Sequence, residues 1–289
     1  MEPDLITDFA FQLHRFLLIS YSLTPFMRKK PLTLSIVIPV FNEERYLKSC
    51  LDAIAVQTIK PDEVIVVDNN STDRSIEIAK RYSFVKILHE KRQHQVFAQV
   101  TGFNLSKSEI LGRIDGDTIL PYDWVAKIKR AFEDKKIVAA TGGAEPFDVP
   151  LKWLGMAIFH WYIYTAGRIA GIRLLWGANC AIRATAWQRI RDRVLMRGDI
   201  WEDYDMSFCL KGIGKIKYIP KMRVGVSARS LHTSFLAHVK YQFRSVRTFY
   251  FRASPLRLSL FILLWTATLL LYPLAAFDDW LYNLKEKKN

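Results

Sequence analysis

Two aspartates separated by one glycine, in Asp115-Gly116-Asp117, directly follow an expected strand at residues 110–114. Residues two apart on an extended chain point the same way, so the two carboxylates repel each other unless a cation or a raised pKa relieves them. Carboxylate oxygens on a loop suit Mg²⁺ or Mn²⁺, which typically keep waters and also bind phosphate groups. The pattern therefore predicts a divalent metal site; the alternative is a turn with two solvated carboxylates.

Three further acidic residues each have a functional and a structural explanation. Asp68 follows a second apolar run and is suited to accept hydrogen bonds from the base or ribose of a nucleotide, although an Asx-turn or a helix cap explains it as well. Glu202 and Asp203 precede an amphipathic segment that ends at Leu210. Acids at a helix N-terminus are favoured by the helix dipole, so capping alone explains this pair too.

Several common chemistries are excluded by spacing. No G-x-G-x-x-G follows the first expected strand, and the chain has no G-x-x-x-x-G-K-S/T loop for phosphates. The six histidines are scattered without metal-ligand spacing. The three cysteines are far apart and odd in number, which indicates neither a disulfide framework nor a cysteine zinc site and favours a reducing compartment.

Strands and helices alternate along the first half of the chain. The expected strands share an apolar, largely β-branched character and lie at residues 33–40, 62–69, 84–88, 110–114 and 137–141. Helices are expected after Asn42 as N-cap, after Ser71 or Thr72, over residues 93–106, and from Pro121. This alternation predicts a Rossmann-like, doubly wound and mainly parallel α/β sheet. Ligands of such sheets bind beyond the carboxyl ends of the strands, where the polar and acidic residues follow.

Charge is unevenly distributed along the 289 residues, whose net charge is +14. A composition of 50% hydrophobic and 13% aromatic residues excludes a disordered chain. Residues 206–277 contain no Asp or Glu, so this block is expected to attract phosphates or an anionic lipid surface. The alternative is a solvated basic face. Nucleic acid is not expected as a partner, because no groove-reading motif accompanies the charge.

The C-terminal part has the composition of a membrane-associated region. Residues 258–277 contain no ionisable side chain and are long enough to cross a bilayer, with an in-plane helix or a buried soluble helix as alternatives. Arg252 and Arg257 precede them, so the positive-inside rule predicts a cytoplasmic catalytic side at the cell membrane. Residues 235–250 are expected to form a basic amphipathic helix, residues 153–167 a core or interfacial helix, and residues 1–30 an amphipathic lead-in.

Five blocks of the sequence read, in order, SIVIPVFNEERYL, VIVVDNNSTDRS, RIDGDTILPYDWV, LLWGANCAIRATAW and DIWEDYDMSFCL. Together they resemble the family 2 inverting glycosyltransferases, which have the GT-A fold, and the resemblance covers residues 34–226. It implies a glycosyltransferase domain at residues 31–230, followed over residues 231–289 by the basic helix, the apolar helix and a short tail.

The resemblance also implies a role for each matching residue. Four residues would line the nucleoside pocket: Pro39, Val40, Asn42 and Glu43. Asp68 would contact the base, Asp115 would lie near the ribose and sugar, and Asp117 would hold the Mg²⁺ or Mn²⁺ that bridges the diphosphate. Asp203, paired with Glu202, would be the general base. Asn179 would border the acceptor.

Two departures from the family pattern limit these expectations. The stretch Ala98-Gln99-Val100-Thr101-Gly102 lacks the donor-binding Arg of many members, for which Arg113 is expected to compensate, and Arg223 or Arg229 would face the diphosphate. The Q-x-x-R-W motif of processive synthases is absent, because Ser245 stands three residues after Gln242.

The expected activity is the transfer of one hexosyl group from a nucleotide-diphospho-sugar, with UDP favoured as the nucleotide. The acceptor would be a hydroxyl or a phosphate, lipid-linked, at the cytoplasmic face of the membrane. The alternatives are a polyprenyl-phosphate glycosyltransferase and a non-catalytic scaffold that binds nucleotide with the same fold. The residues indicate no oligomeric state.

Overall fold

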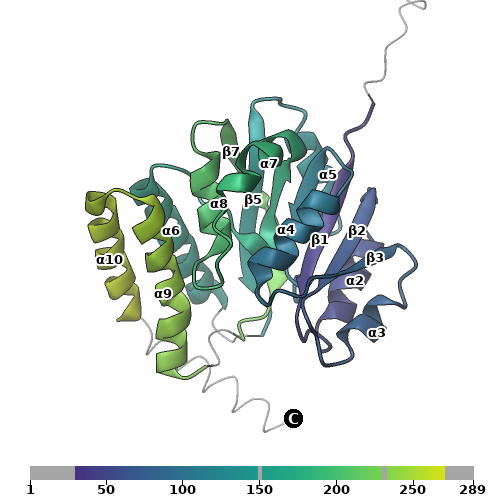
Figure 1. Cartoon of the computed structure of the whole chain (residues 1–289), viewed down its shortest axis with the longest axis horizontal. Helices are drawn as coiled ribbons and strands as arrows, with labels where there is room; N and C mark the ends of the chain where they lie inside the picture. Colours follow the sequence, from purple (N-terminus) through teal and green to yellow (C-terminus); the bar gives the residue numbers. More distant parts are fainter. Residues whose placement is uncertain (1–29, 149–151, 230–232, 271–289) are drawn as a thin grey trace, which may run out of the picture. The chain divides into compact units, whose positions relative to one another are not determined.

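A computed structural model describes residues 30–148, 152–229 and 233–270 of the chain (Figure 1). The expected lead-in at residues 1–30 belongs to a separate unit, residues 1–31, and all but its last residue lies outside the described part. The other unit is built on a seven-stranded sheet with the order β3-β2-β1-β4-β6-β5-β7. Its strands are β1 (Leu34–Val40), β2 (Glu63–Asp68), β3 (Val85–His89), β4 (Ile110–Arg113), β5 (Ile137–Pro146), β6 (Cys180–Arg183) and β7 (Lys215–Val226).

The centre of the sheet is parallel, as predicted. β1 pairs in parallel with β2 and with β4, and Val40 lies opposite Asp68 in this register. Every residue of β1 is buried, which fits a strand covered on both faces. Because β1, β2 and β4 run in the same direction, the loops that follow them leave the sheet at one edge.

The far side of the sheet differs from the prediction. β6 pairs antiparallel with both β4 and β5, so the sheet is mixed, and neither β6 nor β7 was expected. β6 has only four residues, and β7 is an edge strand with Lys215, Lys217 and Lys221 among its residues. Such sequences lack the continuous apolar run that reveals a buried strand.

Helices cover both faces of the sheet. Ile36 and Ile38 of β1 pack toward α2 (Leu47–Ala55), α3 (Ser75–Ala79) and α5 (Trp124–Ala131). Val37, whose side chain points to the other face, packs with residues of α4 (Gln95–Leu105), α7 (Ala184–Ile190) and α8 (Glu202–Leu210). Short 3-10 turns, η1 (Gly177–Asn179) and η2 (Arg191–Arg193), precede β6 and follow α7.

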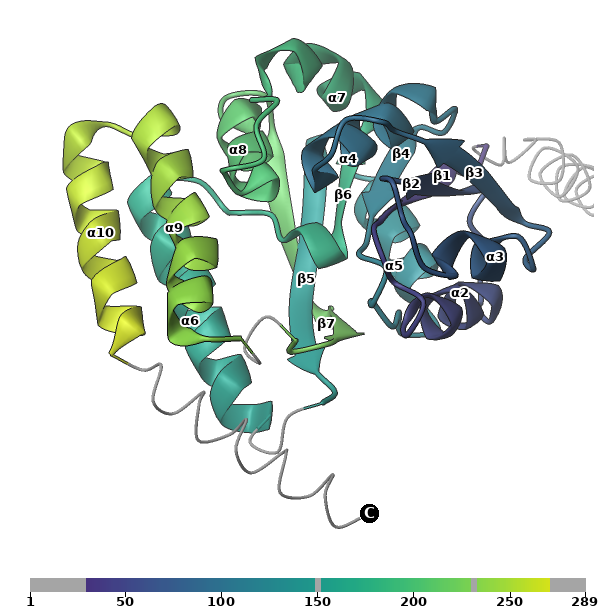
Figure 2. The same ribbon diagram turned by 60° about the horizontal axis from the view of Figure 1, so that its bottom comes forward.

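Three helices form a separate layer beside α8, as Figure 2 shows: α6 (Lys152–Ala170), α9 (Phe235–Arg252) and α10 (Pro255–Leu269). Their shared apolar cluster includes Phe249 of α9 and Phe261 of α10, whose rings stack with centroids 3.7 Å apart. Residues 235–250 are helical, as predicted. Among the described residues, no helix combines the length and apolar composition needed to cross a membrane. Residues 271–277 of the predicted span lie outside that part of the chain.

Three predicted helix starts are wrong. Neither Ser71 nor Thr72 starts a helix, because α3 begins at Ser75. Asn42 does not cap a helix: its backbone has φ 55°, its side chain accepts a hydrogen bond from Thr72 N, and α2 begins only at Leu47. Pro121 does not open α5, which begins at Trp124 after a turn. Pro121 O accepts from Trp124 N and from Gln57 Nε2, so Pro121 lies in the turn that leads into α5.

Candidate functional site

Loops that follow β1 and β2 are bound to each other at the edge of the sheet. Asn42 Oδ1 accepts from Thr72 N at 2.8 Å, and Asn69 N donates to Val40 O at 2.8 Å. Asp68 lies at this junction, where its Oδ1 accepts from Ser71 N at 2.9 Å and its Oδ2 lies 3.1 Å from His89 Nδ1. Pro39 and Val40 are buried in β1 next to these loops. The expected nucleoside-binding residues therefore lie together.

Arg229 joins two acids at the same edge. Its Nη1 donates to Glu43 Oε2 at 2.7 Å, its Nη2 also donates to Glu43, and that Nη2 lies 3.5 Å from Asp117 Oδ2. Its guanidinium lies 5.6 Å from the centroid of the Tyr46 ring. Burial raises the pKa of Glu43, and Arg229 opposes that increase. Of the two arginines expected to face a diphosphate, Arg229 is the one beside the acids.

Arg113 connects the Asp-Gly-Asp turn to the Glu202-Asp203 pair. Its side chain is only 2% exposed, and its Nη2 lies 2.8 Å from Asp115 Oδ1 and 3.1 Å from Glu202 Oε1. Asp115 Oδ1 also accepts from Gln95 Nε2 at 2.7 Å. One buried guanidinium therefore holds a residue after β4 and a residue at the start of α8 at a single place.

Asp203 is buried next to Glu202, at the start of α8. Its Oδ2 accepts from Gly177 N at 2.9 Å, and its Oδ1 accepts from Tyr204 N at 2.8 Å. Burial, followed by the charge of Glu202, raises the pKa of Asp203 to about 7, against the opposing effect of Arg113. Since a general base works best when its pKa is close to the working pH, this carboxylate is suited to accept a proton.

The position of Arg113 depends on a glycine. A Cβ at Gly177 would lie 1.2 Å from Arg113 Nη1, so Gly177→Ala must displace the guanidinium from Asp115 and Glu202. We expect this variant to lose about 1–3 kcal/mol of stability in urea unfolding and most of its activity. The control is Gly225→Ala, whose Cβ would meet its nearest neighbour at an ordinary 3.4 Å. Equal stability of the two variants would contradict the steric role of Gly177.

Asn179 has a different environment from the one expected at an acceptor site. It is fully buried, its Oδ1 accepts from Trp124 Nε1 at 2.8 Å, and its Nδ2 donates to Gly143 O and Met222 O. Its side chain therefore ties strands and helices together inside the domain.

Two residues that the sequence did not single out lie at the site. Gln95, at the start of α4, contacts Asp115, and Tyr241 of α9 lies beside Trp201 with ring centroids 5.7 Å apart. The Tyr241 side chain is 44% exposed. Gln95 follows the expected strand at residues 84–88. No other feature of the sequence could have indicated its role.

Asp115 and Asp117 are suited to a cation that binds together with substrate phosphates. Among the described residues, no three His, Cys, Asp or Glu side chains are grouped so as to hold a metal ion. Burial and the charge of Asp115 raise the pKa of Asp117 to about 7, which is the mark of a carboxylate that lacks enough positive charge nearby. Because Mg²⁺ usually takes one or two carboxylates together with substrate phosphates, Asp115 and Asp117 fit such an ion.

Comparison with known proteins gives a consistent result. The family model described as "Glycosyl transferase family 2" matches residues 35–192, more than half of the 289 residues. Glycosyltransferase GlyA of Streptococcus pneumoniae is 31% identical over 131 residues, 44% of this chain and 18% of that protein. Putative glycosyltransferase EpsH of Bacillus subtilis is 24% identical over 182 residues, 62% of this chain and 51% of that protein. The matches thus span at most about half of these relatives.

Solved structures share the fold at lower identity. Mannosyltransferase PcManGT from Pyrobaculum calidifontis, in complex with GDP-Man and Mn²⁺, has a TM-score of 0.62 at 17% identity, covering 94% of this chain and 81% of that one. TarS 1–349 of S. aureus, in complex with UDP-GlcNAc, has a TM-score of 0.51 at 16% identity, covering 74% and 67%. Both likenesses concern the mixed α/β architecture.

Proposed function

Since the chain belongs to glycosyl transferase family 2, we propose that it moves one hexosyl group from a nucleotide-diphospho-sugar to an acceptor, with inversion at the anomeric carbon. The observation that carries this proposal is the buried guanidinium of Arg113 between Asp115 and Glu202. It joins the acids that follow β4 to the acids that begin α8. An inverting transfer needs both groups at one place, because the acceptor attacks as the donor's diphosphate leaves.

The donor half of the site lies around the loops after β1, β2 and β4. Asp68 and Asn42 are at hand for the nucleoside, and Asp115 is available for the ribose and sugar. A divalent cation held by Asp115 and Asp117 would neutralise the charge that develops on the leaving diphosphate. Arg229 is exposed on one side and bound to Glu43, so it can turn toward a phosphate oxygen without crossing the core.

The acceptor half is formed by Glu202 and Asp203. Asp203 would take the proton of the attacking hydroxyl, while the backbone N–H groups of Gly177 and Tyr204 hold its carboxylate in place. Arg113 keeps Glu202 turned toward Asp115. No covalent enzyme intermediate is needed for this single displacement.

The donor is proposed to be a UDP-sugar. UDP-GlcNAc occurs in the TarS complex and GDP-Man with Mn²⁺ in the PcManGT complex, so both nucleotides belong in the test. Release of UDP or GDP from a panel of nucleotide sugars in Mn²⁺, and its loss in Asp203→Asn, supports the proposal. A chain that releases neither nucleotide with any donor or acceptor tested contradicts it.

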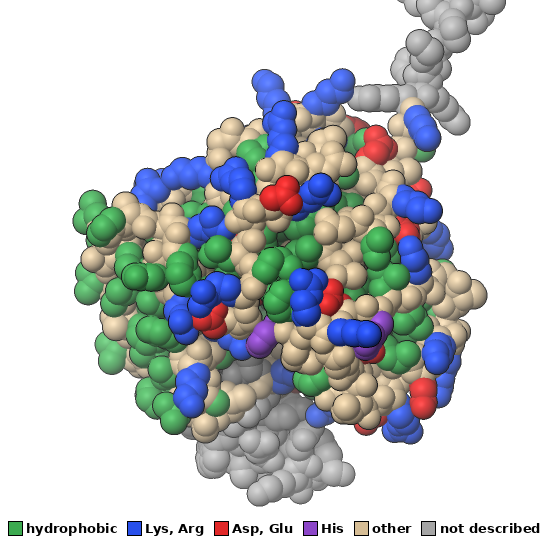
Figure 3. Space-filling view, in the orientation of Figure 1, with side chains coloured by type: hydrophobic (Ala, Val, Ile, Leu, Met, Phe, Trp, Pro, Cys, Tyr) green, Lys and Arg blue, Asp and Glu red, His purple; other side chains and the backbone are tan. Residues whose placement is uncertain are grey.

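The location is proposed to be the cytoplasmic face of the cell membrane. Hydrophobic side chains gather over α9 and α10 at the left of Figure 3. The most exposed of them on these helices are Leu236, Tyr250, Leu256 and Leu263. Lys240 and Arg247 lie on α9, and a surface that combines apolar side chains with cations suits an anionic bilayer.

Flotation with anionic vesicles tests this location. We expect the wild-type protein to float with the vesicles and Leu256→Ser/Leu263→Ser to float less, because the two side chains are 71% and 66% exposed. The matched control, Val56→Ser/Ile59→Ser, removes exposed apolar side chains near the end of α2. Equal flotation of both variants would contradict this assignment.

A further inference from the structure

The loop that leads into α8 is held by α9. Residues 194–201 form neither helix nor strand between η2 and α8, and the side chain of Trp201 makes no hydrogen bond that would cap α8. Glu202 and Asp203 follow this loop directly. The position of these two acids therefore depends on what anchors the loop.

Thr248 of α9 binds the backbone at the start of α8. Its side chain is fully buried, and its Oγ1 accepts from Trp201 N at 2.9 Å. The same hydroxyl donates to Arg244 O, one turn earlier on α9, at 2.9 Å. A hydroxyl has one proton and two lone pairs, so both bonds form together. Since Trp201 immediately precedes Glu202, the bond from Trp201 N fixes the backbone from which both acids project.

A second anchor lies one turn further along α9. Arg252 Nε donates to Asp205 Oδ1, and Arg252 Nη2 donates to Arg193 O. Asp205 is fully buried in the first turn of α8, and its Oδ2 accepts from Leu195 N at 2.8 Å. Because a buried carboxylate without a partner is costly, Asp205 keeps this arrangement fixed. Arg252 therefore ties the beginning of the loop to the first turn of α8.

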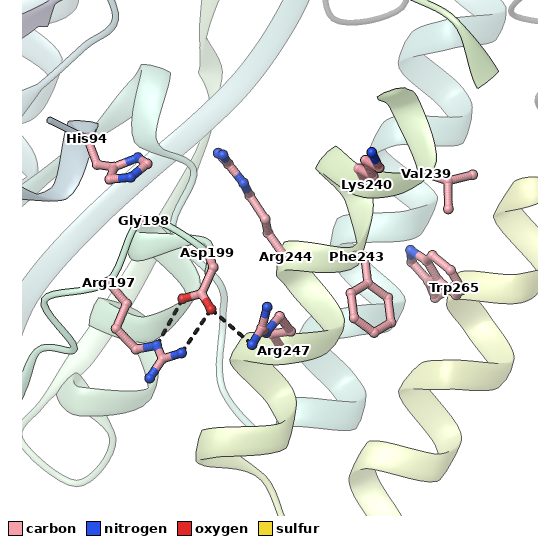
Figure 4. A pocket seen from close by; sticks show the side chains of 10 residues that line it. All are labelled: His94, Arg197, Gly198, Asp199, Val239, Lys240, Phe243, Arg244, Arg247 and Trp265. Atoms are coloured by element: carbon pink, nitrogen blue, oxygen red, sulfur yellow. Dashed lines mark hydrogen bonds and ion pairs between the residues drawn. The ribbon is translucent and has the colours of Figure 1, made fainter. Parts of the chain in front are cut away.

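A third contact holds the middle of the loop. Figure 4 shows Asp199 between Arg197 of the loop, at 2.9 Å, and Arg247 of α9, at 3.1 Å. Lys240 and Arg244, on earlier turns of α9, instead line a groove of about 920 Å³ between that helix and the loop. The three anchors thus come from the C-terminal half of α9.

The geometry points to Thr248 as a positioning residue for the transfer: its hydroxyl fixes the backbone at Trp201, and the two acids that follow keep their places. This inference rests on the proposed function. Arg113 Nη2 lies 3.1 Å from Glu202 Oε1, and a contact of this length is lost when the backbone moves by 1 Å or so. A misplacement of about that size costs up to about 10²-fold in rate. Thr248 itself has no place at the donor or the acceptor and acts through Glu202 and Asp203.

Thr248→Val in the full chain tests the inference, because valine keeps the β-branched shape and removes the hydroxyl. Release of UDP or GDP from the panel of nucleotide sugars in Mn²⁺ gives kcat and KM. We expect kcat to fall about tenfold or more, with the KM for the donor changed less than about twofold, since the donor is assigned to other loops. Thr248→Ser, which keeps the hydroxyl, should restore kcat to within about threefold of the wild type.

Ser245→Ala is the matched control, because it removes a second buried hydroxyl from the same helix. Ser245 is fully buried, and its Oγ donates to Gln242 O at 2.6 Å and lies 3.3 Å from Tyr162 Oη of α6. Its partners are in α9 and α6 and not in the loop before α8. We expect Ser245→Ala to lose stability in urea much as Thr248→Val does, while its kcat stays at the wild-type value.

The surroundings of Asp203 can be followed without any sugar transfer. Burial is the main cause that raises its pKa to about 7, so a carboxylate displaced toward water should titrate at lower pH. The titratable groups around it are Glu202, Arg113, Cys180, Tyr162, Tyr204 and Tyr241. None of these is replaced in Thr248→Val. The difference in melting temperature between Thr248→Val and Thr248→Val/Asp203→Asn should therefore change less from pH 5 to pH 8 than the same difference in the wild-type background.

Two results would overturn the inference. One is a Thr248→Val variant that is less stable but has the kcat of the wild type, which would mean that Thr248 only packs. The other is a Ser245→Ala variant that loses as much kcat as Thr248→Val, since the loss would then not depend on the bond to Trp201. A failure of the proposed function gives a different result: the wild type consumes no donor, while the melting temperatures still report whether Thr248 holds Asp203 in place.

Discussion

Asp203→Asn should slow sugar transfer by about 10²- to 10⁴-fold, the usual contribution of a positioned general base. The substitution keeps the size of the side chain and removes the proton-accepting carboxylate. Donor binding should stay close to that of the wild type, since the donor is assigned to the loops after β1, β2 and β4. Asp192→Asn, at an exposed position, is the matched control and should transfer normally.

The pH dependence of the rate gives an independent check on Asp203. Its pKa is raised to about 7, mainly by burial, so the base is protonated below that pH. With saturating donor and Mn²⁺, the wild-type rate should fall about tenfold for each pH unit below 7 and level off above it. A pH profile without this limb, or an Asp203→Asn variant as fast as the wild type, would contradict the assignment.

Asp203 should also make the stability of the protein depend on pH. The rate rises with pH, whereas this contribution to stability falls with pH. The folded chain keeps a proton on Asp203 that the unfolded chain releases near pH 4, so this contribution to stability is present at acid pH and is lost as the pH rises through about 7. The melting temperature of the wild type relative to Asp203→Asn should therefore be higher at pH 5 than at pH 8. Comparing the two proteins at each pH cancels the titration of Asp117 and Glu43.

Asp117→Asn should remove most of the metal-supported activity. If the cation supplies about 3 kcal/mol of transition-state stabilisation, its loss lowers the rate roughly 10²-fold. Asn at this position offers one neutral oxygen in place of a carboxylate, while Arg229 remains nearby and repels a cation. The measurement is the initial rate against Mn²⁺ concentration, and the wild type in excess chelator should behave like the variant.

Two outcomes would contradict this role of Asp117. One is full wild-type activity in excess chelator, which would mean that the reaction needs no divalent ion. The other is an Asp117→Asn variant with the same dependence on Mn²⁺ as the wild type. Asp192→Asn again provides the control for a loss of charge at an exposed aspartate.

The sequence was sufficient for the parts of the site that depend on local pattern. β1 and the centre of β2 are buried runs of apolar residues, and β4 begins with Ile110 and Leu111, so the local pattern predicts all three strands. The positions of Asp68 and Asp115 follow directly, since each comes at the end of a predicted strand and parallel strands end at one edge.

Long-range contacts were not predictable in the same way. Arg229 and Glu43 are separated by 186 positions, and the pattern around Arg229 does not indicate which acid it would meet. The need for glycine at position 177, in η1, arises only because Arg113 of β4 fills the space where a Cβ would be. Charged and short strands such as β7 and β6 gain their stability from neighbours rather than from their own residues.

The most direct test of the central claim, that acids from separate strands hold a cation and an activated nucleotide at one edge, is the affinity of Asp203→Asn protein for UDP and for GDP with and without Mn²⁺. UDP and GDP carry no transferable sugar, so the measurement involves no turnover. We expect Mn²⁺ to tighten the binding of one nucleotide about tenfold or more, and Asp117→Asn to abolish that gain. Affinities for both nucleotides that do not respond to Mn²⁺ would contradict the account.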